Sequence, residues 1–73
     1  MYIVIEIQSY DTGDIAYLTT KETSLENAYH KYHTVLAAAA ISGLPYHSCV
    51  ILDPLGSTVA RDYFSHGQHK TEE

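Results

Sequence analysis

Disulfide bonds cannot stabilise this chain from within, because Cys49 is its only cysteine. With 73 residues it is expected to form one domain over residues 1–66. A domain of this size buries only about 60% of the surface that its unfolded chain exposes. Such small domains usually depend on disulfides, a metal or a partner subunit. The domain is therefore expected to be stabilised by self-association, by a metal or by an unusually good core. For a chain without disulfides, a reducing cytoplasm is the simplest setting.

Positive charge is also scarce. Four Lys and Arg residues stand against nine Asp and Glu residues, and the formal net charge is -5. The cations are scattered along the chain: Lys21, Lys31, Arg61 and Lys70. Without a basic stripe to follow a phosphate backbone, nucleic-acid binding is disfavoured. The carboxylates are dispersed too, so ordinary solubility is their simplest role. A basic partner, or imitation of nucleic acid by charge, is the alternative.

Long apolar runs are absent. No window approaches the ~20 apolar residues of a membrane span. The opening "MYIVIEIQ" has no basic start and carries Glu6 within its apolar run, so no signal peptide is expected. The last residues, 67–73 ("GQHKTEE"), are polar, and we expect them to form a disordered tail.

The first twenty residues have the pattern of a β-hairpin. In "MYIVIEIQSY" the side chains alternate between two faces, which is typical of a strand. One face carries Ile3, Ile5 and Ile7; the other carries Tyr2, Val4, Glu6 and Gln8. The turn "DTGD" follows, with Gly13 suited to a positive φ, and residues 15–20 form the returning strand.

Residues 23–42 are predicted to form a helix. Thr23 and Glu26 have the spacing of a capping box, and Gly43 is a C-terminal stop signal. At helical spacing one face carries Leu25, Ala28, Tyr29, Tyr32, Val35, Leu36, Ala39 and Ala40. The smooth outer patch of Ala37, Ala38 and Ile41 reflects either helix propensity or a subunit contact.

A second hairpin completes the chain. The apolar run "SCVILD" predicts a central strand, "DPLG" is typical of a type I turn, and the more polar "STVARDYF" predicts an edge strand. The fold class is therefore α+β: a two-layer ββαββ domain with a four-stranded antiparallel sheet in the order 2-1-3-4 and one helix on one face. We expect the other face to keep Tyr2 and Val4 open to water, together with Tyr17 or alternate residues of the third strand. That is an apolar surface, which predicts a homodimer or higher oligomer.

The histidines do not form a recognisable catalytic or metal motif. His30 and His33 are neighbours on the predicted helix and could hold a metal with further ligands, but a lone HxxH is common by chance. Cys49 lies in an apolar run, where a thiol is buried with a raised pKa. We therefore expect no enzyme activity, no cofactor and no metal, with a helix-bound metal as the alternative.

One cluster could bind a ligand near the open end of the second hairpin: Tyr46, His47, Arg61, Tyr63 and His66. Aromatic rings stack on flat bases, and an arginine binds phosphate with two parallel hydrogen bonds. A single small subunit has too little concave surface for such a ligand, so the pocket is expected at a subunit boundary. Plain surface and interface packing is the alternative.

The stretch "KYHTVLAAAAISGLPYHSCVILDPLG", after the opening "IVIEIQ", resembles small uncharacterised proteins encoded by phages and mobile elements of gut bacteria. The resemblance covers the chain from the first strand to "YFSH". It implies a small accessory protein in the cytoplasm of a bacterial host, where it would neutralise a component of anti-phage defence. Sequestration of a nucleotide-derived signal at subunit interfaces is the first version of this hypothesis. Direct inhibition of a host effector protein, or a structural role without ligand, are the others.

Overall fold

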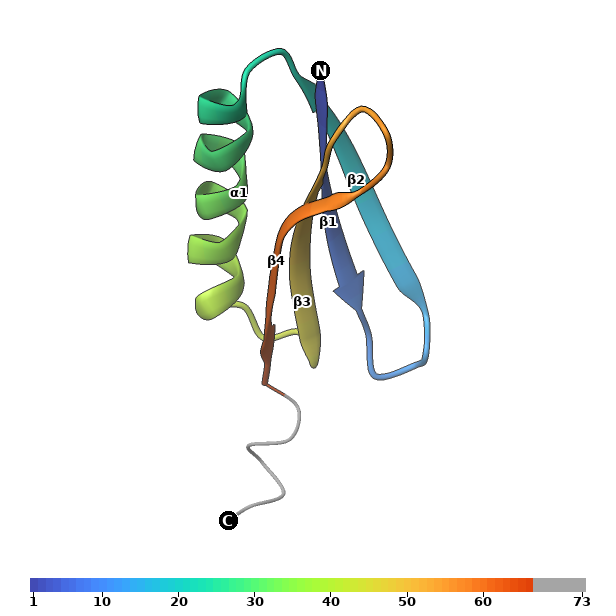
Figure 1. Cartoon of the computed structure of the whole chain (residues 1–73). Coiled ribbons are helices and arrows are strands. Elements are labelled where there is room, and N and C mark those ends of the chain that lie inside the picture. Colours follow the sequence, from blue (N-terminus) through green and yellow to red (C-terminus); the bar gives the residue numbers. More distant parts are fainter. Residues whose placement is uncertain (67–73) are drawn as a thin grey trace.

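Four strands and one helix follow one another in the order ββαββ over residues 1–66, the part of the chain that the computed structural model describes (Figure 1). The elements are β1 (Tyr2–Ser9), β2 (Ile15–Glu22), α1 (Leu25–Ala40), β3 (Tyr46–Leu52) and β4 (Thr58–Ser65). All neighbouring strands pair antiparallel in the order β2-β1-β3-β4. This confirms the predicted fold. The predicted disordered tail, 67–73, lies outside the described residues.

Two tight turns close the hairpins, and each contains a glycine with positive φ. Gly13 has a φ of 95°, and Gly56 has a φ of 87°. In the second turn the Gly56 N–H donates to the Asp53 carbonyl at 3.0 Å. The Asp53 carboxylate also accepts the N–H groups of Leu55 and Ser57. The left-handed backbone that both turns require favours glycine, as expected for Gly13.

Helix α1 is shorter than predicted at both ends. Its N-cap is Ser24, whose Oγ accepts the Asn27 N–H at 3.1 Å, so the predicted cap at Thr23 was wrong by one residue. At the other end the C-cap is Ile41, two residues before Gly43. Serine and threonine are both common N-caps, and here it is the Ser24 hydroxyl that accepts an N–H of the first helical turn.

The core lies between α1 and the strands β1, β3 and β4. It contains Val4, Ala28, Tyr32, Val35, Cys49 and Ile51, with Tyr2, Tyr29, Leu36 and Ala60 packed against them. Ala28 and Ala39 are fully buried, because side chains of this size let the helix approach the sheet closely. Ala40, predicted on the inner face, is exposed. Ala37, Ala38 and Ile41 are exposed, as expected for the outer helix patch.

The helix covers the face of β1 that we expected to remain open. Val4 is only 1% exposed, and its partner across the sheet is the buried Ile51. The prediction that Tyr2 and Val4 face water was therefore wrong. Both faces of β1 carry large apolar side chains, so the pattern of this one strand did not decide which face the helix covers. The neighbouring strand β3 is also apolar on both faces, and in the structure Cys49 and Ile51 lie on the helix side with Val4.

The sheet face turned away from α1 is strongly apolar, and we call it the open sheet face. Strand register places on it the apolar and aromatic residues Ile3, Ile5, Ile7, Ile15, Tyr17, Tyr46, Val50, Leu52 and Tyr63, and the polar residues Ser9, Thr19, Lys21, Ser48, Arg61 and Ser65. Its centre is the pair Ile5 and Val50, on the two inner strands. Tyr17 is exposed, as predicted, but it lies on the face opposite to Tyr2 and Val4, with which it was expected to share a surface. No other element of residues 1–66 covers the open sheet face (Figure 1).

Candidate functional site

The structure divides the five predicted ligand residues between the two faces of the sheet. Tyr46, Arg61 and Tyr63 lie on the open sheet face and are exposed. His47 follows Tyr46 on the same strand and therefore points to the helix side, where it is buried. His66 lies just beyond β4 and also contacts the helix. Only three of the five predicted residues therefore share a surface.

Tyr46, Arg61 and Tyr63 lie along the β3–β4 side of the open sheet face, and Tyr17 and Lys21 lie on its β2 side. Arg61 and Tyr63 are two positions apart on the edge strand β4, and Tyr46 lies on the adjacent β3. Arg61 has no ion pair among residues 1–66. Its guanidinium can bind an oxyanion with two parallel hydrogen bonds, and the rings can stack on a planar group. One flat sheet would cover only one side of such a ligand.

His47 takes part in a buried network of hydrogen bonds and does not face the surface where a ligand was expected. Its Nε2 lies 2.7 Å from Glu6 Oε2, and its Nδ1 lies 3.2 Å from Ser42 Oγ. Gln8 donates to the same Glu6 oxygen at 3.0 Å, and the Tyr10 hydroxyl donates to Gln8. These bonds explain how Glu6 and Gln8 are accommodated on the helix side, because buried polar groups need partners.

A serine, a histidine and a carboxylate in series also occur in hydrolytic sites, but this arrangement does not suit that chemistry. His47 is only 4% exposed, so a substrate cannot reach its ring. Ser42 Oγ also accepts the Leu44 N–H at 3.3 Å, which fixes it within the connection between α1 and β3. A base must reach the proton that it abstracts from a substrate or nucleophile. The network therefore tethers this connection to β1.

Two further histidines of the described residues, His33 and His66, have ring contacts within the domain. His66 Nε2 lies 2.7 Å from the Ala39 carbonyl, near the C-terminal end of α1, and its ring stacks on Phe64. His33 stacks on Tyr29, with ring centroids 5.9 Å apart. Among residues 1–66, no group of three or more His, Cys, Asp or Glu side chains is arranged to hold a metal ion.

Cys49 is fully buried, and burial raises the pKa of its thiol to about 11, with the nearby Glu6 carboxylate acting in the same direction. This confirms the predicted buried thiol with a raised pKa. Because the thiolate is the reactive form, Cys49 is unreactive near neutral pH.

The sequence reasoning missed the Glu6 network. Glu6 and His47 lie 41 positions apart, and only the pairing of β1 with β3 brings them together. The signal available was the polar face of β1, where Glu6 and Gln8 interrupt an apolar strand at alternate positions. That pattern predicts polar partners on the adjacent strand, and His47 is the ring opposite Gln8.

Comparison with known proteins gives no match, since no family model, curated protein or solved structure proves similar to this chain. Within residues 1–66, no helix has the length and apolar character needed to cross a membrane. The resemblance to phage and mobile-element proteins therefore stays a prediction.

Proposed function

We propose that this protein is a self-associating binding protein and that two copies pack through the open sheet face. The observation that carries this proposal is the aliphatic centre of that face. Ile3, Ile5, Ile7, Val50 and Leu52 lie there on the two inner strands, only partly buried within one chain. An antiparallel sheet can leave one face in water when that face is polar. A contiguous apolar face instead marks an interaction surface.

The size of the face suits a dimer. Four strands spaced about 4.8 Å apart, each of about eight residues rising about 3.4 Å, span roughly 500 Å² in projection. Side chains that stand up from the sheet add accessible area to this figure. A stable complex buries about 800 Å² on each partner, which is of the same order. Two identical faces packed about a twofold axis form a self-complementary contact.

The ligand proposed for this assembly is a nucleotide-derived signal. Arg61 would bind its phosphate, while Tyr46 and Tyr63 would stack on its base. The second copy would supply the wall that one flat face lacks. The setting, neutralisation of a component of anti-phage defence, rests on the sequence resemblance alone. Direct inhibition of a host effector protein through the same face is the second version, favoured by the aliphatic character of its centre.

The assembly is tested by sedimentation equilibrium at micromolar concentration. We expect twice the chain mass of 8.1 kDa for the wild type and a monomer for Val50→Lys, which places a charge at the centre of the open sheet face. Ile41→Lys is the matched control, because Ile41 is 88% exposed on the outer helix patch. Circular dichroism should show both variants folded. If the wild type is a monomer, the proposal is wrong. If Ile41→Lys is a monomer, the dimer forms through the outer helix patch and not through the open sheet face.

The ligand is tested by calorimetry with cyclic nucleotides and ADP-ribose derivatives. Arg61→Ala should abolish binding and leave the dimer intact. Lys21→Ala is the control, because Lys21 is an exposed cation on the same face, on β2. If the wild-type dimer shows no heat with these compounds, signal sequestration is wrong and direct binding to a host protein takes its place.

A further inference from the structure

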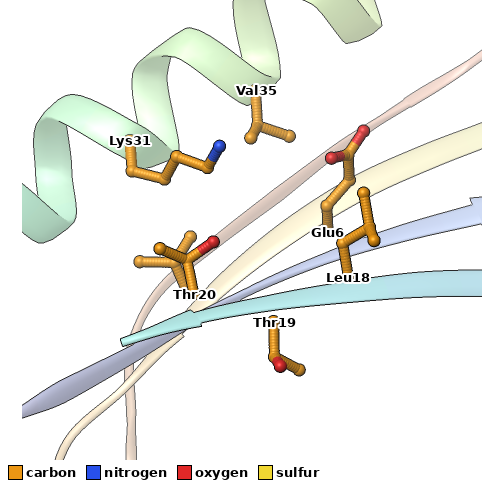
Figure 2. A pocket seen from close by; sticks show the side chains of 7 residues that line it. Glu6, Leu18, Thr19, Thr20, Lys31 and Val35 are labelled. Carbon is orange, nitrogen blue, oxygen red and sulfur yellow. The ribbon is translucent and has the colours of Figure 1, made fainter. Parts of the chain in front are cut away.

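A separate hollow of about 170 Å³ lies on the helix side of the sheet, between α1 and β2 (Figure 2). It is lined by Val4, Glu6, Leu18, Thr19, Thr20, Lys31 and Val35. It exists because α1 packs mainly over the other strands and leaves the outer strand β2 less covered. Leu18 shows this, since it is on the helix side of the sheet and yet 64% exposed.

Two opposite charges face this hollow from its two walls. The Lys31 side chain reaches in from α1, and the Glu6 carboxylate stands up from β1 (Figure 2). They form no ion pair with each other, and Lys31 has no ion pair with any other residue in 1–66. Lys31 is therefore available to a bound molecule, whereas Glu6 already contacts His47 through Oε2 and can offer only its other oxygen.

The Glu6 carboxylate is held in position by the buried network. His47 and Gln8 both bind its Oε2, which leaves Oε1 without a hydrogen-bond donor among residues 1–66. An acceptor that is fixed before binding loses little conformational entropy when a ligand arrives. Oε1 can thus accept a hydrogen bond from a cationic ligand group.

Between the charges the walls are aliphatic. Val4 and Val35 are nearly fully buried beneath the hollow, and Leu18 borders it. A cavity of about 150 Å³ accommodates a molecule the size of benzene. The volume here therefore suits a ligand of about six to ten non-hydrogen atoms, well below the size of a nucleotide.

We propose that this hollow binds a small zwitterion with an aliphatic body, of the class of free aliphatic α-amino acids. Its carboxylate would pair with Lys31 and its ammonium group with Glu6 Oε1, while its side chain packs against Val4, Leu18 and Val35. Both polar contacts are charge-assisted hydrogen bonds, the stronger kind. This site lies on the other side of the sheet from the proposed dimer contact and does not depend on it.

Leucine is the probe, titrated into the isotopically labelled protein and followed by amide chemical shifts. We expect saturable shifts at Leu18, Lys31 and Val35. Leucine analogues that lack one charge, 4-methylpentanoate and 3-methylbutylamine, should bind about 10- to 100-fold more weakly, because each loses one hydrogen bond between charged groups. Lys31→Met should weaken leucine binding by a similar factor. Lys21→Met, on the open sheet face, should bind leucine like the wild type.

Three results would overturn this inference: no saturable shift with leucine, shifts confined to residues outside the hollow, or unchanged binding by Lys31→Met. Equal affinity for leucine and 4-methylpentanoate would show that the ligand class is wrong. The Val50→Lys variant separates this inference from the proposed function. It should lose the dimer and still bind leucine.

Discussion

Cys49 is the residue whose environment most clearly opposes its ionised form. Its pKa is raised from 9.0 to about 11, first by burial and then by the Glu6 carboxylate. Well below pH 9 the thiol is neutral in both the folded and the unfolded chain, so the fold keeps its full stability. As the pH rises from about 9 to about 11, the unfolded chain ionises first and the fold loses stability. The loss should reach about 2 kcal/mol.

This loss is measured by urea unfolding across that alkaline range. The wild type should lose stability as the pH rises, and Cys49→Ala should lose less, because it has no thiol to ionise. Burial and the Asp62 charge also raise the pKa of Tyr32. Cys49→Ala should therefore still lose some stability at alkaline pH, and adding Tyr32→Phe should reduce that loss further. Parallel stability profiles for the wild type and Cys49→Ala would show that the thiol does not contribute.

At the scale of the element, the cap of α1 distinguishes two adjacent hydroxyl residues. Ser24 Oγ accepts the Asn27 N–H, and no hydrogen bond joins Thr23 to the helix within residues 1–66. Ser24→Ala should therefore lower the free energy of unfolding by about 1 kcal/mol, the usual value of an N-cap. Thr23→Ala, the matched control, should change it by less than about 0.5 kcal/mol, as for a surface position. Denaturant unfolding measures the stability of both variants. Equal losses of stability in the two would show that Thr23 also caps the helix, as the sequence predicted.

All five elements and their order were predictable, because each has its own periodicity and its own turn signals. The face covered by the helix was not, because that choice depends on two strands together. Val4 belongs to the core only when it is paired with Ile51. Glu6 is acceptable beside the core because His47, on the next strand, and Gln8 both bind it.

The candidate ligand cluster was predicted from its place at the open end of the second hairpin, without separating the two faces of the sheet, and this explains its partial agreement with the structure. Tyr46 and His47 are adjacent on β3, and adjacent side chains of a strand point to opposite faces. The same rule keeps Arg61 and Tyr63 together on β4. Alternation within each strand could therefore have separated His47 from the cluster. The attachment of His66 to Ala39 depends on tertiary packing, which sequence spacing does not contain.

At the scale of the whole molecule, a sheet with one covered face should depend on its partner for stability. If two chains fold as a dimer, dilution favours the unfolded monomers, and the melting temperature depends on protein concentration. For two chains of 73 residues, we expect a rise of about 3 to 5 °C for each tenfold increase in concentration. Val50→Lys should melt at a lower temperature that does not vary with concentration, and Ile41→Lys should keep the wild-type dependence. Differential scanning calorimetry over a hundredfold range measures this, and a constant wild-type melting temperature would mean that one chain folds without a partner.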